Sequence, residues 1–416
     1  MTPTQLSVAF FLQAAVIIAT ARLVGGAAEK WLGQPRVVGE MIAGVLLGPS
    51  LFGAFAPALQ AQLFPAATKP MLYVVAQLGV GLYMFVVGLG FDRREFASNA
   101  RGAALVSVSG MLAPLAAAAA LVPWLLTQPG LFDPKIGNGQ ATLFLGAAIA
   151  ITAFPMLARI IHERGISGTT IGTLSLSAGA IGDAGAWAFI AVVLATLGDG
   201  ALFAVRAIGG GLAFAALMIW VAPKLLQRLM GPEQDQLSQP ALALALIFFL
   251  LSAWTMDAIG IHAVFGGFLL GTAMPRGRMA DGLKATLEPV TVVLLLPFFF
   301  TFSGLHTDLR LVGTGQMLVI AIVILLASII AKGGASYLAA RASGQSHRDA
   351  LGIGALMNAR GLMELIVINI GLQRGIIGPT LFSMLVLMAI VTTLMASPLF
   401  EMTRRGQSPQ PKAAAA

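Results

Sequence analysis

The residues of this sequence that could do chemistry are charged side chains inside long apolar runs. Asp183 is the clearest, since it lies mid-way along the run from 177 to 187, which is otherwise glycine, alanine, serine, isoleucine and tryptophan. Burying a charge in a bilayer costs roughly 3 kcal/mol or more, so an ionisable residue there is functional by default. A carboxylate in this position can hold a hard cation or a proton, but not easily both. The alternative is a structural carboxylate paired with a buried base.

Two further residues could serve the same site. Lys332, in the run 328–334, could pair with Asp183 and be displaced when an ion arrives. Alternatively its long side chain could reach the membrane surface, since the span could end near Tyr337. Thr152 offers a hydroxyl and an adjacent carbonyl freed by a helix break, and both oxygens suit a hard monovalent ion. We therefore expect Asp183 and Thr152 to hold the cation.

Other polar residues in the apolar runs have a structural interpretation. Arg360 and Glu364 are four residues apart, so they share a helix face and can pair. Arg360 can also hold carbonyls freed by a broken helix, and we expect it to stabilise the site without touching the ion. For Glu40, at a span entrance, a capping or interfacial role is expected. Ser175 and Ser177 are weaker ligand candidates, because serine is ordinary at contacts between membrane helices.

Several classes of chemistry are excluded by what the sequence lacks. It has no cysteine, and its spans contain no Ser/His pair, HExxH motif or paired aspartates, so neither an intramembrane enzyme nor a cofactor is expected. The histidines have no metal-binding spacing, and they are His162, His262, His306 and His347. Among them, His162 and His347 fall in loops and are expected to be solvated. Asp257 is expected to be exposed in a tight outside turn, and the glycine pairs to pack helices closely.

The elements that must position these residues are membrane helices. Of 416 residues, 58% are hydrophobic and 10% are charged, whereas soluble domains carry roughly 25% charged residues. The first apolar run, from Leu6 to about Ala28, lacks a basic leading region and a cleavage site, so it is expected to be a retained helix. We predict an all-α integral membrane protein with 13 spans, centred near Ala15, Gly44, Val80, Leu115, Ala150, Ala186, Phe214, Phe248, Phe265, Leu295, Leu325, Val367 and Leu387. The eighth and ninth spans are separated only by residues 254–260.

Basic residues predict the orientation of these spans. With 13 spans and a cytoplasmic C-terminus, 18 lysines and arginines fall in inside regions and 5 in outside regions. Only Lys332 and Arg360 fall within spans. Because inside loops of membrane proteins are enriched in lysine and arginine, the N-terminus is expected outside and the C-terminus inside. The net charge of +8 therefore reflects topology, and no nucleic-acid partner is expected.

Two spans are interrupted by breaker residues. The run 151–155, with Thr152 and Pro155, interrupts the fifth span, and the run 358–361 interrupts the twelfth. The two lie seven spans apart, and an odd offset reverses the direction of a helix. Broken helices at matching positions of two inverted halves indicate a transporter site near the midplane of the bilayer. A channel, the main alternative, usually needs a ring of equivalent groups, whereas this sequence has one buried carboxylate.

A set of motifs, in this order and spacing, resembles the monovalent cation:proton antiporters, in the branch of Kef-type bacterial systems and plant cation/H+ exchangers. The resemblance spans nearly the whole membrane domain. Its motifs are Gly33-Gln34-Pro35-Arg36-Val37-Val38-Gly39-Glu40, Gly48-Pro49-Ser50, Phe85-Val86-Val87-Gly88-Leu89, Thr152-Ala153-Phe154-Pro155-Met156-Leu157-Ala158-Arg159, Gly260-Ile261-His262-Ala263-Val264-Phe265-Gly266, Phe302-Ser303-Gly304-Leu305 and Met357-Asn358-Ala359-Arg360-Gly361-Leu362-Met363-Glu364-Leu365.

The resemblance implies a core domain with two crossed, broken helices and a scaffold domain that forms a homodimer, with elevator-like transport. It implies exchange of K+ or Na+ for H+, and it maps the family's ion-binding aspartate, threonine and core lysine onto Asp183, Thr152 and Lys332. The residue before the aspartate is usually acidic, Asn or Gln in relatives, and here it is Gly182.

From these features we expect an antiporter membrane domain over 1–402 and a short cytoplasmic tail over 403–416. No regulatory domain is expected to follow. The lipid bilayer, the cation and the proton are the expected partners, and the inner membrane of a bacterium is the expected location.

Overall fold

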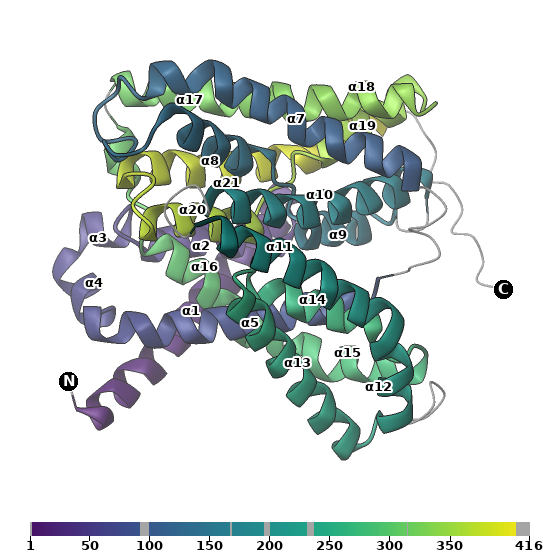
Figure 1. The fold of residues 1–416 in the computed structure, drawn as a ribbon. Helices are drawn as coiled ribbons and strands as arrows, with labels where there is room; N and C mark the ends of the chain where they lie inside the picture. The colour runs from purple at the N-terminus through teal and green to yellow at the C-terminus, as the bar shows by residue number, and fades with distance from the viewer. Residues whose placement is uncertain are drawn as a thin grey trace.

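The computed structural model describes residues 2–91, 100–166, 169–194, 200–230, 237–313 and 315–404, and throughout these ranges the regular elements are helical (Figure 1). A single isolated bridge joins Phe132 and Ile377. The α-helices are α1 (Pro3–Leu32), α2 (Arg36–Leu47), α3 (Phe52–Phe55), α4 (Pro57–Leu63), α5 (Lys69–Leu89), α7 (Ala100–Leu125), α8 (Asn138–Ala150), α9 (Phe154–Glu163), α10 (Thr170–Leu194), α11 (Gly200–Ala216), α12 (Ala222–Met230), α13 (Gln239–Ile259), α14 (Ala263–Ala273), α15 (Arg278–Val290), α16 (Leu296–Gly304), α17 (Gly315–Ile329), α18 (Ala335–Ala342), α19 (His347–Leu356), α20 (Leu362–Gln373) and α21 (Pro379–Arg404).

Three π-helical segments join consecutive helices without breaking them. They are η3 (Leu217–Val221), η4 (Thr291–Leu295) and η6 (Ile330–Gly334). Short 3₁₀ turns occur at η1 (Ala66–Thr68) and η5 (Leu309–Val312). Single-turn π segments within α-helices are frequent at functional sites, and η6 carries Lys332.

The helices are long and apolar enough for a membrane protein with many spans. A helix needs ~20 residues to span a bilayer. Among the described residues, 9 helical stretches have the length and hydropathy to do so. Shorter apolar helices cover Thr170–Gly182, Ala263–Ala273 and Glu364–Gln373. An all-helical chain with multiple spans is therefore confirmed. The count of 13 depends on the shorter and interrupted helices, and it stays a prediction.

One predicted boundary is wrong. The separation expected over residues 254–260 is shorter, because α13 continues through Ile259 and ends at Gly260. Gly260 has a φ of +93°, a left-handed conformation that favours glycine and commonly ends helices. Asp257 consequently lies in the last turn of α13 instead of a loop. It is exposed, and its Oδ1 accepts a hydrogen bond of 2.7 Å from the N–H of Ala263, the first residue of α14.

The helices form two groups that meet along α2 and α16. Helices α7–α10 and α17–α21 lie together in the upper part of Figure 1, and α1, α5 and α12–α15 lie in the lower part. Contacts of α16 with α2, α5 and α20, and of α2 with α21, connect the groups. In the lower group a separate apolar cluster packs α5 against α11–α15, with Phe85, Phe249 and Leu270 near its centre.

Glycines allow the closest helix contacts. A Cβ at Gly44 of α2 would overlap the carbonyl of Phe300 in α16, and a Cβ at Gly304 would overlap the carbonyl of Gly44. Gly266 and Gly267 of α14 contact the backbones of α13 and α5 in the same way. The packing role predicted for the pair at 266 and 267 is confirmed, in keeping with the use of small residues between membrane helices.

Candidate functional site

Both predicted helix interruptions are present. Residues 151–153 separate α8 from α9, and residues 357–361 separate α19 from α20. The sequence had indicated breaks over 151–155 and 358–361, so each prediction is right to within two residues at either end. Each break leaves backbone groups without helical partners, and these must be satisfied in another way.

The two interrupted segments bond to each other. The N–H of Ala153 donates to the carbonyl of Ala359 over 3.1 Å. The hydroxyl of Thr152 donates to the carbonyl of Met357 over 3.0 Å, and Thr152 is fully buried. Since the single hydroxyl proton is used in this bond, the lone pairs of the Thr152 oxygen can coordinate a cation or accept a hydrogen bond from a donor.

Two buried cationic side chains bind the end of α8. The guanidinium of Arg360 donates to the carbonyls of Ala148 (3.2 Å) and Ile149 (2.6 Å), and the ammonium of Lys332 donates to the carbonyl of Ala150. The last carbonyls of a helix lack intrahelical partners and carry a partial negative charge, which attracts cations. These three consecutive carbonyls are therefore engaged by the protein's own positive charges.

Lys332 is held inside the molecule. Its side chain is 1% exposed, and the alternative in which it extends to the membrane surface is wrong. Gly110 of α7 lies beside it, since a Cβ built there would lie 3.9 Å from the Lys332 Nζ atom, an ordinary contact distance. The π segment η6 contains Gly333, whose own missing side chain lets η6 press against Asn358 in the second break.

Arg360 and Glu364 form the predicted pair. Their closest N and O atoms are 3.4 Å apart and both side chains are fully buried, so the stabilising role expected of Arg360 agrees with its contacts. Two partners were missed by the sequence analysis, namely Ser328, whose Oγ accepts from Arg360, and Thr393, whose Oγ1 accepts from the Arg360 N–H over 3.1 Å. Ser328 precedes Lys332 by four residues. This helical spacing, which places both residues on one helix face, is the sequence feature that could have pointed to Ser328.

Asp183 lies on α10, and its side chain falls outside the described residues. The backbone around it is described. Gly179 of α10 packs against Phe154, the first residue of α9, and Gly182 faces Ser107 of α7. Asp183 therefore belongs to the stretch of α10 that runs between the first helix break and α7. Its assignment as an ion ligand stays a prediction.

Glu40 has a different environment from the one expected. It lies within α2, is 1% exposed, and its Oε1 is 3.4 Å from Nη1 of Arg22 in α1. Arg22 also donates to the carbonyl of Val292 in the π segment η4, over 2.9 Å. Glu40 is thus part of an ion pair between two helices, and neither a helix cap nor an exposed interfacial group. No sequence pattern indicated its partner, which lies across the turn between α1 and α2.

The histidines take local roles. His347 is exposed, with its Nδ1 2.9 Å from the hydroxyl of Tyr337, while the side chain of His162 lies outside the described residues. The Nδ1 of His262 accepts from the N–H of Val264 at the start of α14, over 3.4 Å. Where the structure describes side chains, no group of three His, Asp or Glu residues could hold a metal ion.

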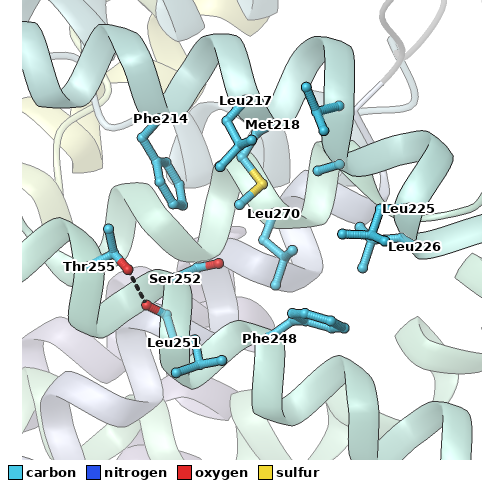
Figure 2. A pocket seen from close by; sticks show the side chains of 12 residues that line it. Phe214, Leu217, Met218, Leu225, Leu226, Phe248, Leu251, Ser252, Thr255 and Leu270 are labelled. Atoms are coloured by element: carbon cyan, nitrogen blue, oxygen red, sulfur yellow. Dashed lines mark hydrogen bonds between the residues drawn. The ribbon is translucent and has the colours of Figure 1, made fainter. Parts of the chain in front are cut away.

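A cavity of about 190 Å³ lies in the lower group of helices, between η3, α12, α13 and α14 (Figure 2). Phe214, Met218, Phe248 and Leu270 are among the side chains that line it, and its lining carries no charged residue. The hydroxyl of Thr255, at its edge, bonds to its own helix (Figure 2). This apolar cavity suits hydrocarbon and is unsuited to an ion.

Comparisons with known proteins agree with the fold. The family model described as sodium/hydrogen exchanger, transmembrane, matches residues 16–403. The Na(+)/H(+) antiporter NhaS4 of Synechocystis is 37% identical, with 92% of this chain and 94% of that protein covered. Cation/H(+) antiporter 20 of Arabidopsis thaliana is 31% identical over 93% of this chain, and K(+)/H(+) antiporter 1 of Saccharomyces cerevisiae is 30% identical over 94%. The chain spans about half the length of the plant and yeast proteins, namely 47% and 46%.

Solved structures show the same architecture. A structure of the sodium proton antiporter MjNhaP1 from Methanocaldococcus jannaschii has a TM-score of 0.73 and 14% identity, with 99% of this chain and 100% of that chain covered. A second structure of MjNhaP1, at pH 8, has a TM-score of 0.66 and 16% identity, with 94% and 97% covered. With a family model that matches most of its length and relatives above 30% identity, the chain belongs to the transmembrane sodium/hydrogen exchanger family.

Proposed function

We propose that this protein is a secondary antiporter that exchanges a monovalent cation, Na+ or K+, for H+. The observation that carries the proposal is the junction of the two broken helices, where a buried threonine and two buried cations meet beside α10. Such junctions suit ion binding because unwound backbone and helix ends supply partial charges inside the bilayer. The names of the Synechocystis and yeast relatives, an Na+/H+ and a K+/H+ antiporter, support both cations as candidates.

We assign Asp183 and Thr152 as the ligands shared by the cation and the proton. The Asp183 carboxylate is the group that either a proton or a cation neutralises, so arrival of one releases the other. Lys332, Arg360 and Glu364 form the supporting charge network. The bonds of Lys332 and Arg360 to the end of α8 keep the first break in its observed form, and Glu364 pairs with Arg360. No resident cofactor or metal is needed in this scheme.

Exchange of one cation for one proton follows from this assignment. Gly182, next to Asp183, has no carboxylate that could bind a second proton. Lys332 is engaged with the carbonyl of Ala150, which favours an ammonium that stays charged through the cycle. We therefore propose electroneutral exchange, in which the rate does not follow the membrane potential.

The proposed architecture has 13 spans, with the N-terminus outside and the C-terminus in the cytoplasm of a bacterial cell. Residues 1–402 form the transport domain and 403–416 a short tail. The two groups of helices in Figure 1 support a core (α7–α10 and α17–α21) that moves elevator-like against a scaffold. Homodimerisation through the scaffold is part of the proposal.

Purified protein in proteoliposomes tests the function. Addition of Na+, K+, Li+ or Rb+ outside vesicles that are acidic inside should release protons, and the fastest ion identifies the substrate. Cation-driven proton release separates an antiporter from its alternative, a proton-independent channel or uniporter. Cation flux that continues unchanged without a pH gradient, and moves no protons, would support the channel instead.

A further inference from the structure

The buried hydroxyl of Ser107, in α7, has no hydrogen-bond partner in the part of the chain that the structure describes. The residue is 1% exposed. Buried hydroxyls within helices usually donate to the carbonyl four residues before them. Thr291, Thr392 and Thr393 all do so here, at 2.7 to 2.8 Å. Since buried polar groups are nearly always bonded, an unused one requires an explanation.

The Ser107 hydroxyl faces the helix that carries Asp183. A Cβ built on Gly182 would lie 3.2 Å from the Ser107 Oγ atom. Gly110, one turn further along α7, faces Lys332 on the other side. This face of α7 therefore lies between the Asp183 helix and the lysine that binds the end of α8.

The register of α7 against α8 places Ser107 close to the level of the first helix break. A Cβ at Gly146 would lie 3.2 Å from the Cα of Leu115, so these two residues are opposite each other. The two helices are consecutive neighbours that run side by side (Figure 1). Counting four residues along each, in opposite directions, brings Ala150 beside Met111, one turn from Ser107.

We propose that the Ser107 hydroxyl is a ligand of the transported cation, together with Asp183 and Thr152. This inference rests on the proposed antiport function and adds a third helix, α7, to the ion site. Hydroxyl oxygen is a neutral, hard ligand of the kind that replaces the hydration shell of an alkali cation. A ligand on α7 makes discrimination among Na+, K+, Li+ and Rb+ depend on the distance between α7 and α10.

Gly182 offers a matched steric probe of this contact. Among the described residues, and apart from the helix's own backbone and chain neighbours, the Ser107 Oγ is the only heavy atom within 4 Å of a Cβ built at position 182. Gly182→Ala should therefore displace this hydroxyl by a few tenths of an ångström and disturb little else. Ser107→Ala removes the hydroxyl outright, so the two changes act on one atom.

The experiment measures cation-driven proton release in proteoliposomes at a series of Na+ and K+ concentrations. Ser107→Ala should raise the apparent KM by about tenfold for the preferred ion, equivalent to about 1.4 kcal/mol, and should change the ratio of the Na+ and K+ constants. Gly182→Ala should shift KM in the same direction, and the double variant should be no worse than Ser107→Ala. Ser252→Ala, which removes another buried serine hydroxyl at the apolar cavity of Figure 2, should leave both constants unchanged.

A binding readout accompanies the transport assay. A cation that binds the folded protein raises its melting temperature, and this rise should require higher cation concentrations in Ser107→Ala. Unchanged KM values and an unchanged cation-induced rise would overturn the assignment, as would a Gly182→Ala effect that persists in full without the Ser107 hydroxyl. Asp183→Asn distinguishes failure of the proposed ion site from failure of the Ser107 assignment. If Asp183→Asn still exchanges ions, the proposed ion site itself is contradicted. If Asp183→Asn loses exchange while Ser107→Ala keeps wild-type constants, only the role of Ser107 is contradicted.

Discussion

Arg360 is the buried charge whose removal has the clearest expected consequence. Arg360→Ala deletes a guanidinium that donates to the carbonyls of Ala148 and Ile149 and to the hydroxyl of Ser328. It also leaves Glu364, which is fully buried, without its 3.4 Å ion-pair partner. The end of α8 would lose two of the bonds that satisfy it at the break.

The size of the effect follows from these contacts. Removing one member of a buried ion pair costs about 3–5 kcal/mol, because the other charge is left uncompensated. Each unbonded buried carbonyl adds about 1–3 kcal/mol when no water reaches it. Since the losses share one side chain and are not additive, we expect about 4 kcal/mol in total. At roughly 2–4 °C per kcal/mol, this lowers the melting temperature by about 10 °C.

Thermal unfolding in detergent, followed by tryptophan fluorescence, measures this change. Arg310→Ala is the matched control, since Arg310 pairs with Asp308 at 2.7 Å on an exposed surface, and exposed pairs contribute little to stability. Glu364→Gln in the Arg360→Ala background should restore part of the loss, because it removes the uncompensated charge. A melting temperature for Arg360→Ala equal to that of Arg310→Ala would mean that the buried contacts of Arg360 do not stabilise the fold.

Three other changes have defined outcomes. Lys332→Ala should melt earlier and shift the pH dependence of cation binding, because Ala150 loses its ammonium partner; an unchanged melting curve and pH profile would mean that the ammonium is dispensable. A tag before Thr2 should be accessible from outside the cell and a reporter after Lys412 only from the cytoplasm, whereas a cytoplasmic N-terminal tag would refute the odd number of spans. Burial lowers the pKa of His306, in the connection after α16, below its usual 6.5. The folded state therefore favours the neutral ring, and melting temperature should fall as pH drops below about 6.5; His306→Gln should lose that component, and an identical pH profile would contradict this assignment.

Local sequence signals were enough to find the helix breaks. Pro155 and Thr152 interrupt one apolar run, and Arg360 with Gly361 interrupts another. Because proline, glycine and charged residues are costly inside a span, their presence marks positions where the backbone is satisfied by other groups. The pair of Arg360 and Glu364 followed from helical spacing alone.

Contacts between residues far apart in the chain could not be predicted from the sequence. The sequence allowed Lys332 either a buried partner or a place at the membrane surface, and the choice depends on its burial against the end of α8, where it bonds to the carbonyl of Ala150. Arg22 and Glu40 pair across the turn between two helices, and nothing in their spacing indicates it. The end of α13 was misplaced because Gly260 ends the helix in a left-handed conformation, while Trp254 and Asp257, which lie before it, resemble a polar turn in sequence.

Cation-driven proton release by Asp183→Asn is the most direct test of the proposed exchange. The amide keeps the volume of the side chain and removes its charge. Wild-type and variant protein, both verified as folded by their melting temperatures, would be compared in proteoliposomes with the membrane potential clamped by an ionophore. The wild type should release protons on addition of Na+ or K+, and Asp183→Asn should release none. Full exchange by the variant would contradict the central claim that this carboxylate binds the cation and the proton in turn.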